Sequence, residues 1–308
     1  MSVYATLSAI LAELEKEGKI GAEEYELCES YSLSRLTSFK TGGDATVLFP
    51  KTVSAAAAIY PILKKENIPT FVLGNGSNVI AKDEGYPGLI LSLIGLKKTE
   101  VNGSSITAES GVLLTTVASL AQKNALTGME ALYGIPGTVG GAVFMNAGAY
   151  GTECCDVLTC VTCVTSAGEM RTYAVEDLAL SYRTSRFEGS DDLILSATFG
   201  LQCGDGTAIR ASMDDYMARR VEKQPLEYPS AGSTFKRYEG RFTAQLIDES
   251  GLKGYRHGGA MVSEKHAGFV INYDHATSAD IFAVIKKVQE TIYEREGIHI
   301  QREVRIIE

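Results

Sequence analysis

The sequence predicts an α+β fold with more than one domain, and three observations favour it. The chain has 308 residues, more than one domain ordinarily holds. Short apolar strands alternate with a few helices, which is typical of α+β folds rather than of regularly wound βαβ units. Gly204, Asp205 and Gly206 favour a boundary between a larger N-terminal region, 1–205, and a smaller α+β region, 206–308.

The N-terminal region begins with an amphipathic helix over residues 6–17, which Gly18 ends. Thr52 is placed to cap a second helix that reaches about residue 67, and Pro61 is expected to kink or restart that helix. Further strands are expected at 46–49, 70–73, 88–93, 105–109, 158–166, 169–173 and 193–201, with helical segments at 115–124 and 176–180.

The C-terminal region carries clear helix signals. Helices are expected at 212–223 and 242–250, and strands at 258–262 and 267–272. Thr277 and Asp280 can form a capping pair that opens a helix with one apolar face, and Gly297 ends it. The alternation from 298 to 306 predicts a final strand in which Glu303 and Arg305 point the same way.

Two glycine-rich segments predict a phosphate-binding site. In the stretch 133–151 and in the loop GNGSN at 74–78, successive backbone N–H groups could form an anion-binding concavity, and one dinucleotide could touch both loops. The spacing matches neither the GxGxxG fingerprint nor a P-loop, because no Lys-Ser/Thr pair follows. The alternative is that both segments are tightly packed turns without a ligand.

Composition excludes several classes of function. The net charge is −9, and the acidic excess lies in residues 1–205, which argues against nucleic-acid binding. No apolar run is long enough to span a membrane, and the first helix carries charges that a signal peptide lacks, so a cytoplasmic protein is expected. The four histidines have no metal-ligand spacing. Cys160 and Cys163 would lie on opposite faces of a strand, which disfavours a metal or redox pair.

Several ordered motifs together resemble the UDP-N-acetylenolpyruvoylglucosamine reductase family. They are TSFKTGG at 37–43, LGNGSN at 73–78, GIPGTVGGAVFMNAGAYG at 134–151, YRTSRF at 182–187, QPLEYPSAGSTFK at 224–236, SEKHAGFVIN at 263–272 and EVRII at 303–307. The resemblance implies an FAD-binding region of the vanillyl-alcohol-oxidase (PCMH) type over 1–205, in lobes of about 1–69 and 70–205. It also implies a substrate-binding domain over 206–308 whose last strand returns to the active site.

The resemblance further implies a reaction. NADPH would reduce FAD and leave, and UDP-N-acetylglucosamine enolpyruvate would then be reduced to UDP-N-acetylmuramate for peptidoglycan and cell-wall synthesis. FAD would be noncovalent, because residues 1–205 contain no histidine to carry a histidyl–flavin bond. No nucleic acid, membrane or metal is expected to take part, and the chain is expected to be a monomer.

Functional residues are carried over by motif. Ser233 matches the family's proton donor, Arg183 its catalytic arginine and Glu303 its catalytic glutamate. The residues expected to hold FAD are Gly74, Asn75, Gly76, Ser77, Asn78, Gly137, Gly140, Gly141, Ala147, Gly148 and Ala149. Candidate substrate-binding residues are Tyr182, Lys223, Lys236 and Arg305. The chain resembles the subclass that lacks a tyrosine-bearing loop over the substrate.

Two other functions remain open at this stage. An oxidase of small alcohols could share the flavin-binding fold, although it would not need the AGSTFK and EVR motifs. A non-catalytic nucleotide-binding protein would use the glycine loops without binding flavin.

Overall fold

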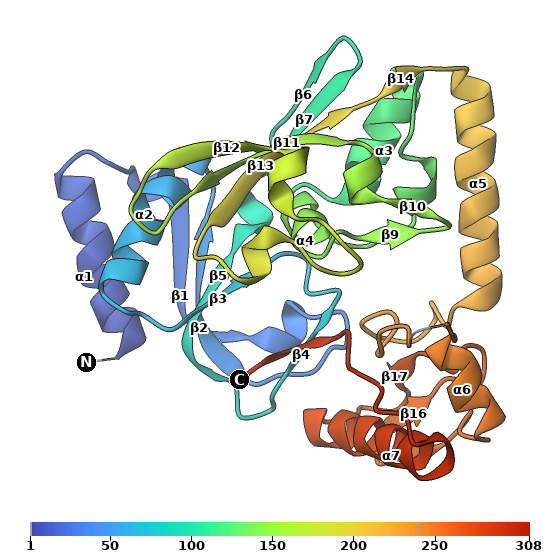
Figure 1. The fold of residues 1–308 in the computed structure, drawn as a ribbon. Helices are drawn as coiled ribbons and strands as arrows, with labels where there is room; N and C mark the ends of the chain where they lie inside the picture. Colours follow the sequence, from blue (N-terminus) through green and yellow to red (C-terminus); the bar gives the residue numbers. More distant parts are fainter. Residues whose placement is uncertain (1, 239) are drawn as a thin grey trace. The chain divides into compact units, whose positions relative to one another are not determined.

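The computed structural model describes residues 2–238 and 240–308 (Figure 1). The contacts within the chain divide it into two compact units. Unit 1 consists of Met1–Glu29, Thr46–Asn75 and Gly88–Ala218. Unit 2 consists of Ser30–Ala45, Gly76–Pro87 and Arg219–Glu308. The chain crosses from unit 1 to unit 2 for the last time between Ala218 and Arg219, inside helix α5 (Gly206–Lys223). The functional division into 1–205 and 206–308 stays a prediction.

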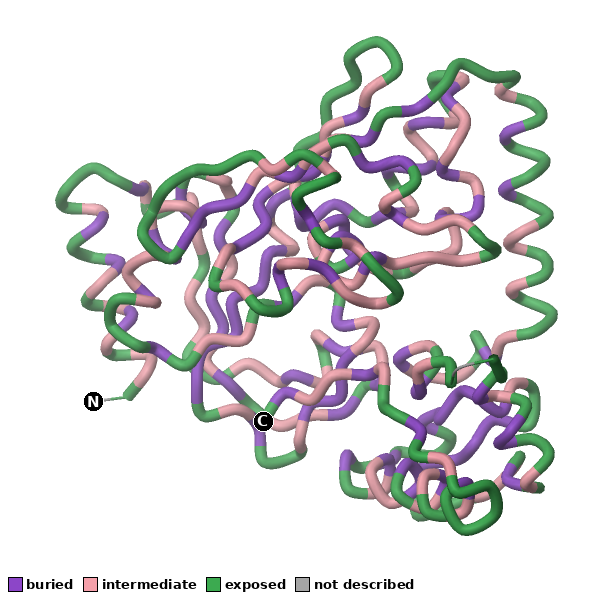
Figure 2. The backbone as a smooth tube through the Cα atoms, in the orientation of Figure 1, coloured by how far each residue is buried: buried purple, intermediate pink, exposed green. Residues whose placement is uncertain are grey.

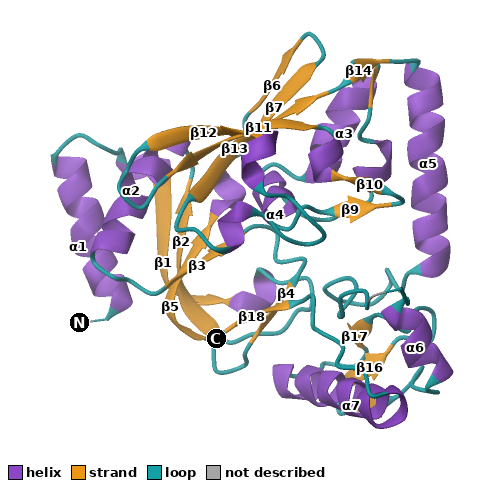
Figure 3. Ribbon diagram, in the orientation of Figure 1, coloured by secondary structure: helices purple, strands orange, loops and turns teal. Residues whose placement is uncertain are grey.

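Two sheets supply most of the strands of unit 1 (Figure 3). One has the order β1-β2-β5-β3, and its β3 and β5 run parallel. The other has the order β12-β11-β13-β7-β6, with antiparallel neighbours. The strand bounds are β1 Tyr25–Ser32, β2 Asp44–Pro50, β3 Thr70–Leu73, β5 Tyr86–Ser92, β6 Thr99–Asn102, β7 Ser105–Glu109, β11 Leu158–Val164, β12 Met170–Ala174 and β13 Leu193–Gly200. The first sheet includes residues of unit 2 at one end of β1, β2 and β5.

Helices and two short strand pairs complete the described part of unit 1, which also contains most of α5. The pairs are β8 (Leu126–Thr127) with β14 (Gln202–Cys203), and β9 (Gly148–Ala149) with β10 (Thr152–Glu153). The helices are α1 Val3–Lys16, α2 Val53–Lys65, α3 Leu114–Lys123 and α4 Val139–Phe144. Apolar residues of α1 and α2 meet Leu89, Leu91 and Leu195 in one buried core. A second core forms around α3, α4 and the larger antiparallel sheet.

Helix α2 differs from the expectation at Pro61. Its predicted cap is confirmed, since Thr52 Oγ1 accepts a hydrogen bond from the Ala55 N–H at 3.1 Å. The helix then runs through Pro61 to Lys65 as one element instead of restarting. Proline removes one backbone hydrogen bond, but burial of this helix's apolar face offsets that loss, because packing supplies most helix stability in proteins.

Helix α5, Gly206–Lys223, begins six residues before the predicted start. Asp205 explains the difference, because its carboxylate accepts from the Thr207 N–H at 2.9 Å and its carbonyl accepts from the Ile209 N–H at 2.9 Å. Aspartate is a favoured N-cap residue, so the Gly-Asp-Gly segment leads directly into a helix. The buried residues of α5 are Ile209 and Met213, and most of the helix is exposed (Figure 2).

The glycine-rich stretch contains a helix that the sequence analysis missed. Val139–Phe144 forms α4, and the Thr138 hydroxyl accepts from the Gly141 N–H at 3.4 Å at its start. Glycine disfavours helix, but Val139, Ala142 and Val143 are buried in the second core of unit 1. Packing therefore overrides the local preference.

Unit 2 contains a small antiparallel sheet, two helices and a parallel strand pair. The elements are β15 Arg256–His257, β16 Ala260–Val262, β17 Val270–Asn272, α6 Thr243–Glu249, α7 Ser278–Glu296, β4 Val79–Ala81 and β18 Arg305–Ile307. The sheet order is β15-β16-β17, and β18 pairs with β4 in parallel. The predicted capping of α7 is confirmed: Asp280 N donates to Thr277 Oγ1 at 3.1 Å, Thr277 N donates to Asp280 Oδ2 at 3.0 Å, and Gly297 follows at φ +67°.

The last strand is shorter than predicted. Arg305–Ile307 pairs with β4, whereas Arg302 forms an isolated bridge with Phe235. Ile300, Val304 and Ile307 are buried, so the spacing of apolar residues is not the regular alternation of one strand. The segment therefore changes pairing partners along its length. Because it is not one continuous strand, strand alternation no longer predicts that the Glu303 and Arg305 side chains point the same way.

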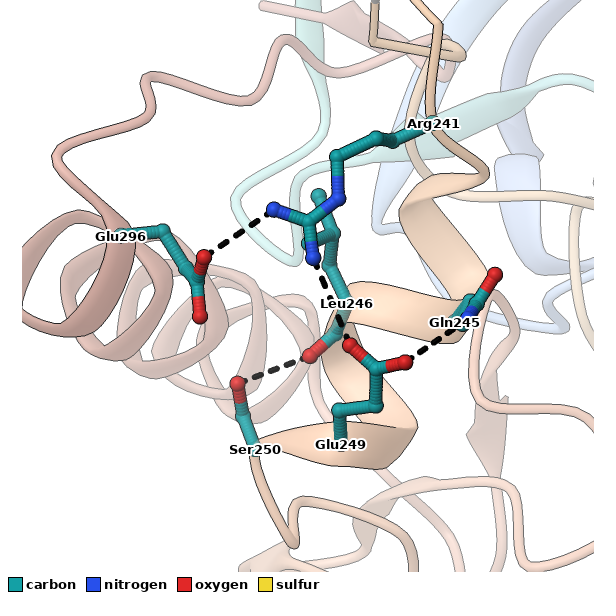
Figure 4. Close-up of polar contacts among 6 residues, drawn as sticks. All are labelled: Arg241, Gln245, Leu246, Glu249, Ser250 and Glu296. Carbon is teal, nitrogen blue, oxygen red and sulfur yellow. Dashed lines mark hydrogen bonds and ion pairs between the residues drawn. The ribbon is translucent and has the colours of Figure 1, made fainter.

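An ion-pair cluster joins α6 and α7 within unit 2 (Figure 4). Arg241 lies 3.4 Å from the Glu249 carboxylate on α6 and 3.0 Å from the Glu296 carboxylate on α7. Gln245 donates to Glu249 at 2.7 Å, so the carboxylate has two donors. These side chains are partly exposed, which limits the contribution of the ion pairs to stability.

Candidate functional site

The two glycine-rich segments meet inside unit 1. Asn75 Nδ2 donates to the Pro136 carbonyl at 2.6 Å. A Cβ added at Gly74 would collide with the Thr138 hydroxyl, so glycine is needed for this close approach. The pairing of the loop after β3 with the stretch before α4 supports the expectation that one ligand could touch both.

The start of α4 does not offer the expected row of free N–H groups. Val139 N donates to the Val112 carbonyl at 2.8 Å, and Gly140 N donates to the Ser110 carbonyl at 2.9 Å. A Cβ at Gly140 would lie 2.8 Å from the Ser110 Cβ. Gly140 is therefore explained by close packing, and the N–H groups of Val139 and Gly140 are not available to an anion; an anion-binding concavity elsewhere in the stretch 133–151 stays a prediction.

Ser110 nevertheless leaves a polar group for a ligand. Its side-chain Oγ is buried and has no hydrogen-bond partner among the described residues. A buried hydroxyl without a partner is costly and rare in folded proteins. This hydroxyl and the glycines beside it fit a bound group with polar atoms, as FAD is.

Residues 76–78, in unit 2, do offer unpaired peptide groups. The structure gives the N–H groups of Gly76, Ser77 and Asn78 no acceptor within the described part of the chain. Gly76 has φ +62°, and a Cβ there would collide with the Leu36 carbonyl. Consecutive unpaired N–H groups next to a left-handed residue are suited to a diphosphate. The fit to FAD is thus better here than at the start of α4.

Arg183 lies at the tip of a tight turn in unit 1. Ser181 and Thr184 exchange two backbone hydrogen bonds of 3.1 Å, which places Tyr182 and Arg183 at the two central positions. Arg183 has φ +57°, a left-handed conformation that is uncommon for a non-glycine residue. Its guanidinium also lies over the Tyr182 ring, with 4.9 Å to the ring centroid. The predicted catalytic arginine and the predicted substrate-binding tyrosine are therefore neighbours in one strained turn.

The Arg183 side chain extends along the segment that follows α4. Its guanidinium donates to the Asn146 carbonyl at 3.4 Å and to the Gly148 carbonyl at 3.3 Å. Ala147 and Ala149 belong to this segment, and their side chains are partly buried. Unit 1 thus brings Arg183 together with three of the residues expected to hold FAD.

Beyond Ala149 the chain turns back sharply in the β9–β10 hairpin. Tyr150 (φ +53°) and Gly151 (φ +86°) form its two-residue turn. A Cβ at Gly148 would lie 2.8 Å from the Glu153 Cγ on the opposite strand, which explains that glycine. The hairpin therefore fixes the path of the backbone that accepts from Arg183.

Ser233 is exposed and unpartnered in unit 2. It follows Gly232, which has φ +72°, and its hydroxyl has no hydrogen-bond partner among the described residues. The next residue is held firmly: Thr234 is buried, its N–H donates to the Gly268 carbonyl at 2.8 Å, and its Oγ1 accepts from the Val270 N–H at 3.0 Å. A fixed backbone thus presents a free hydroxyl.

Glu303 lies beside the Ser233 segment. Its N–H donates to the Thr234 carbonyl at 2.9 Å, and its own carbonyl accepts from Asn78 Nδ2 at 3.4 Å. Arg305 N donates to the Asn78 carbonyl at 3.0 Å. Unit 2 therefore brings the predicted proton donor, the predicted glutamate and the end of the GNGSN loop together, although they are far apart in the sequence.

The positions of Lys223 and Lys236, the two lysines predicted to bind the substrate, say less about their role than the positions of Arg183 and Ser233 do. Lys223 is exposed in the last turn of α5. Lys236 is half-buried, and its backbone is held by Gln301 and by the Thr243 hydroxyl, which donates to the Lys236 carbonyl at 2.6 Å. The contacts recorded for these two lysines involve the Lys236 backbone, so their role stays a prediction.

The cysteines are free thiols. Cys163 is buried in β11 while Cys160 is partly exposed, and burial raises the pKa of Cys163 to about 11. Burial likewise raises the pKa of Cys154 to about 12. Among the described residues, no group of three or more His, Cys, Asp or Glu side chains could hold a metal ion. No helix within the described ranges is long and apolar enough to cross a membrane.

Comparisons with known proteins identify the family. Residues 224–307 match the family model for the UDP-N-acetylenolpyruvoylglucosamine reductase C-terminal domain, and residues 45–174 match an FAD binding domain. UDP-N-acetylenolpyruvoylglucosamine reductase from Lactiplantibacillus plantarum is 47% identical over 283 residues, which cover 92% of this chain and 94% of that protein. The chain belongs to this reductase family.

Two further members agree with this assignment. The Clostridium novyi reductase is 46% identical, covering 92% of this chain and 93% of that protein. The crystal structure of the Thermus caldophilus reductase aligns with a TM-score of 0.80 at 31% identity, covering 92% of this chain and 99% of that chain. Membership confirms the predicted α+β fold with a PCMH-type FAD-binding region, the flavin oxidoreductase class and the FAD cofactor.

Proposed function

We propose that this chain reduces UDP-N-acetylglucosamine enolpyruvate to UDP-N-acetylmuramate, with NADPH as hydride donor and FAD as the intermediate carrier. The observation that carries the proposal is the match to reductases of this name over more than nine-tenths of both chains. The reaction supplies a precursor of peptidoglycan and therefore serves cell-wall synthesis. The finer assignments that follow rest on the local geometry of each unit.

FAD is held by backbone groups of small residues in this proposal. The contributing residues are Gly74, Asn75, Gly76, Ser77, Asn78, Gly137, Gly140, Gly141, Ala147, Gly148 and Ala149. The N–H groups of 76–78, which have no acceptor among the described residues, would hold the diphosphate, and the other small residues would line the cofactor. When bound there, FAD would supply the carrier for the hydride between NADPH and the sugar substrate. We assign noncovalent attachment, and residues 1–205 contain no histidine that could form a histidyl–flavin bond.

Arg183 stabilises the charge that develops on the substrate. A hydride that reaches the terminal carbon of the enol ether drives the electron pair of the double bond toward the carboxylate. A guanidinium can contact a carboxylate with two parallel donors, which makes it the preferred group for this task. The hydrogen bonds from Arg183 to two backbone carbonyls orient the side chain before substrate binds, which is the condition for electrostatic catalysis.

Ser233 donates the proton that completes the reduction. The electron pair returns to the carbon beside the carboxylate, takes the Ser233 proton, and the resulting alkoxide is reprotonated from solvent. The exposed hydroxyl has no hydrogen-bond partner in the part of the chain that the structure describes, so it is free to turn toward that carbon. The Glu303 N–H donates to the carbonyl of Thr234, the residue after Ser233. We assign the Glu303 side chain either to orient groups around the serine or, when protonated, to donate a hydrogen bond.

The remaining assignments concern substrate and setting. We assign residues 206–308 to substrate binding, with the last strand bringing Glu303 and Arg305 to the site. Tyr182, Lys223, Lys236 and Arg305 contact the nucleotide sugar, whose diphosphate and carboxylate require positive partners. The protein acts as a cytoplasmic monomer, without nucleic-acid or membrane partners, and without the substrate-covering tyrosine loop.

Flavin absorbance under anaerobic conditions tests the proposal directly. NADPH should bleach the yellow protein, and subsequent UDP-N-acetylglucosamine enolpyruvate should restore the colour promptly. Bleaching without recovery would reject the substrate, and rapid recovery with oxygen instead would indicate an oxidase. A protein that binds no flavin on reconstitution would contradict the proposal as a whole.

A further inference from the structure

Asn146 is a buried polar residue that the motif analysis did not single out. It follows α4, its exposed fraction is 0%, and its φ is +41°. Asparagine adopts the left-handed conformation more readily than most residues, which explains how the chain can turn here without glycine. Neither the FAD prediction nor the substrate prediction assigns this side chain a task.

Each polar atom of the Asn146 side chain has a partner. Oδ1 accepts from the Cys155 N–H at 3.0 Å, and Nδ2 donates to Glu153 Oε2 at 2.9 Å and to the Ser181 carbonyl at 3.2 Å. Because the Cys155 N–H can only donate and the Ser181 carbonyl can only accept, these contacts fix the orientation of the amide. A buried network with satisfied donors and acceptors is rigid.

The same residue contacts both the base of the Arg183 turn and the Arg183 side chain. Its side-chain amide holds the Ser181 carbonyl at the base of the turn, and its backbone carbonyl accepts from the Arg183 guanidinium at 3.4 Å. The turn has one more anchor on the preceding helix, where Ser185 Oγ donates to the Phe144 carbonyl at 2.8 Å. Asn146 therefore holds both the backbone of the turn, through Ser181, and the guanidinium of Arg183.

We propose that Asn146 is a positioning residue for Arg183 and that it sets the rate at which the reduced enzyme transfers hydride to its sugar substrate. The inference rests on the proposed function. Arg183 is in a strained backbone conformation, which persists only where the surroundings determine it. Loss of the amide donor to Ser181 would let the turn relax and move the guanidinium, and a displacement of about 1 Å can slow catalysis about 100-fold.

The test uses Asn146→Asp, which keeps the shape and the acceptor for Cys155 but removes the donor to Ser181. The two half-reactions are followed separately by flavin absorbance in the holoenzyme. We expect reduction by NADPH to keep its rate and reoxidation by the enolpyruvyl sugar to slow by about 10- to 100-fold, in kcat rather than in KM. Asn124→Asp, at an exposed asparagine after α3, is the matched control and should leave both rates unchanged.

A double-mutant cycle separates positioning from general structural damage. On an Arg183→Ala background, Asn146→Asp should cause no further loss in the sugar half-reaction, because its effect passes through the arginine. Additive losses, or equal slowing of both half-reactions, would overturn the inference. So would a wild-type rate in a folded Asn146→Asp protein that has full flavin content.

A second variant guards against misfolding, since the carboxylate introduced by Asn146→Asp would face the carboxylate of Glu153. Asn146→Asp combined with Glu153→Gln removes that repulsion but still lacks the donor to Ser181. It should be folded and slow in the sugar half-reaction relative to Glu153→Gln alone. Equal rates in these two proteins would overturn the inference. If wild-type protein itself shows no recovery with the sugar substrate, the proposed function fails instead, so the two failures are distinguishable.

Discussion

The two groups assigned to the chemistry, Arg183 in unit 1 and Ser233 in unit 2, have opposite surroundings. Arg183 is half-buried, has a left-handed backbone, and donates to two carbonyls of a rigid segment. Ser233 is exposed, and its hydroxyl has no protein partner within the described residues. The difference matches the tasks that we propose for the two residues. A group that stabilises charge must be oriented in advance, whereas a proton donor must be able to turn toward its acceptor.

The largest expected effect comes from removing the oriented charge. Arg183→Ala should slow reoxidation of the reduced flavin by the sugar substrate by about 100- to 1,000-fold, the range for loss of one donor to a developing anion. Reduction by NADPH should keep its rate. Stopped-flow absorbance of the two half-reactions measures both, and Arg186→Ala, in the segment that follows the turn, provides a comparison arginine. A wild-type rate of reoxidation would reject the charge-stabilising role.

The freedom of Ser233 can be tested through its neighbour. Gly232 has φ +72°, and a Cβ there would meet no atom within 4 Å, so Gly232→Ala introduces backbone strain without a collision. Strain of this kind costs about 1–2 kcal/mol. We expect lower thermal stability and a sugar half-reaction slowed less than by loss of the Ser233 hydroxyl itself. No change in either quantity would show that the left-handed residue is not needed to present the serine.

The cap of α7 offers a change in unit 2 that should affect stability but not chemistry. Thr277→Ala removes the cap and should cost about 1 kcal/mol in the free energy of unfolding. The half-reactions should keep their rates at temperatures where the variant is folded. A selective loss of the sugar half-reaction would mean that the helix start contributes to Ser233 function.

The contribution of the α7 cap to the free energy of unfolding depends on pH, because the cap includes the Asp280 carboxylate. The Thr277 N–H lowers the pKa of Asp280 from its ordinary 3.8, with a further contribution from the Gly259 N–H. A lowered carboxylate pKa contributes stability above the unfolded value that is lost as pH falls through the folded value. Unfolding free energy should therefore drop below about pH 4 partly through this group, and Asp280→Asn should reduce that drop in urea titrations.

The smallest effect is expected at the α6–α7 ion pairs. Arg241→Ala removes contacts with Glu249 and Glu296 whose side chains are partly exposed, so it should cost about 0.2–1 kcal/mol and less at high salt. Denaturant unfolding at two salt concentrations measures this. A loss above about 2 kcal/mol would show that the pair network stabilises unit 2 more than exposed pairs usually do.

Local signals explain what the sequence could predict. The caps at Thr52 and Thr277 and the stop at Gly297 depend on residues within one helical turn, and the structure confirms them. Helix α4 was missed because its glycines oppose helix while its stability comes from core packing. The final strand was overestimated because apolar spacing does not reveal that Arg302 and Arg305 pair with different partners.

The candidate site likewise combines features that local motifs predict with contacts that only the folded chain reveals. The ordered motifs located the Arg183 and Ser233 segments and the glycine loops. They did not reveal that the Val139 and Gly140 N–H groups are already bonded, or that Asn146 links Ser181 with Cys155. These contacts join residues from nine to 35 positions apart. Such pairings depend on the folded chain and have no local sequence signal.

The most direct measurement is the pair of half-reactions in Ser233→Ala under anaerobic conditions. The account predicts that NADPH bleaches the flavin at the wild-type rate, and that recovery with UDP-N-acetylglucosamine enolpyruvate slows by about 100-fold or more, as expected for loss of a proton donor. Recovery at the wild-type rate, or equal slowing of both steps, would contradict the assignment of Ser233.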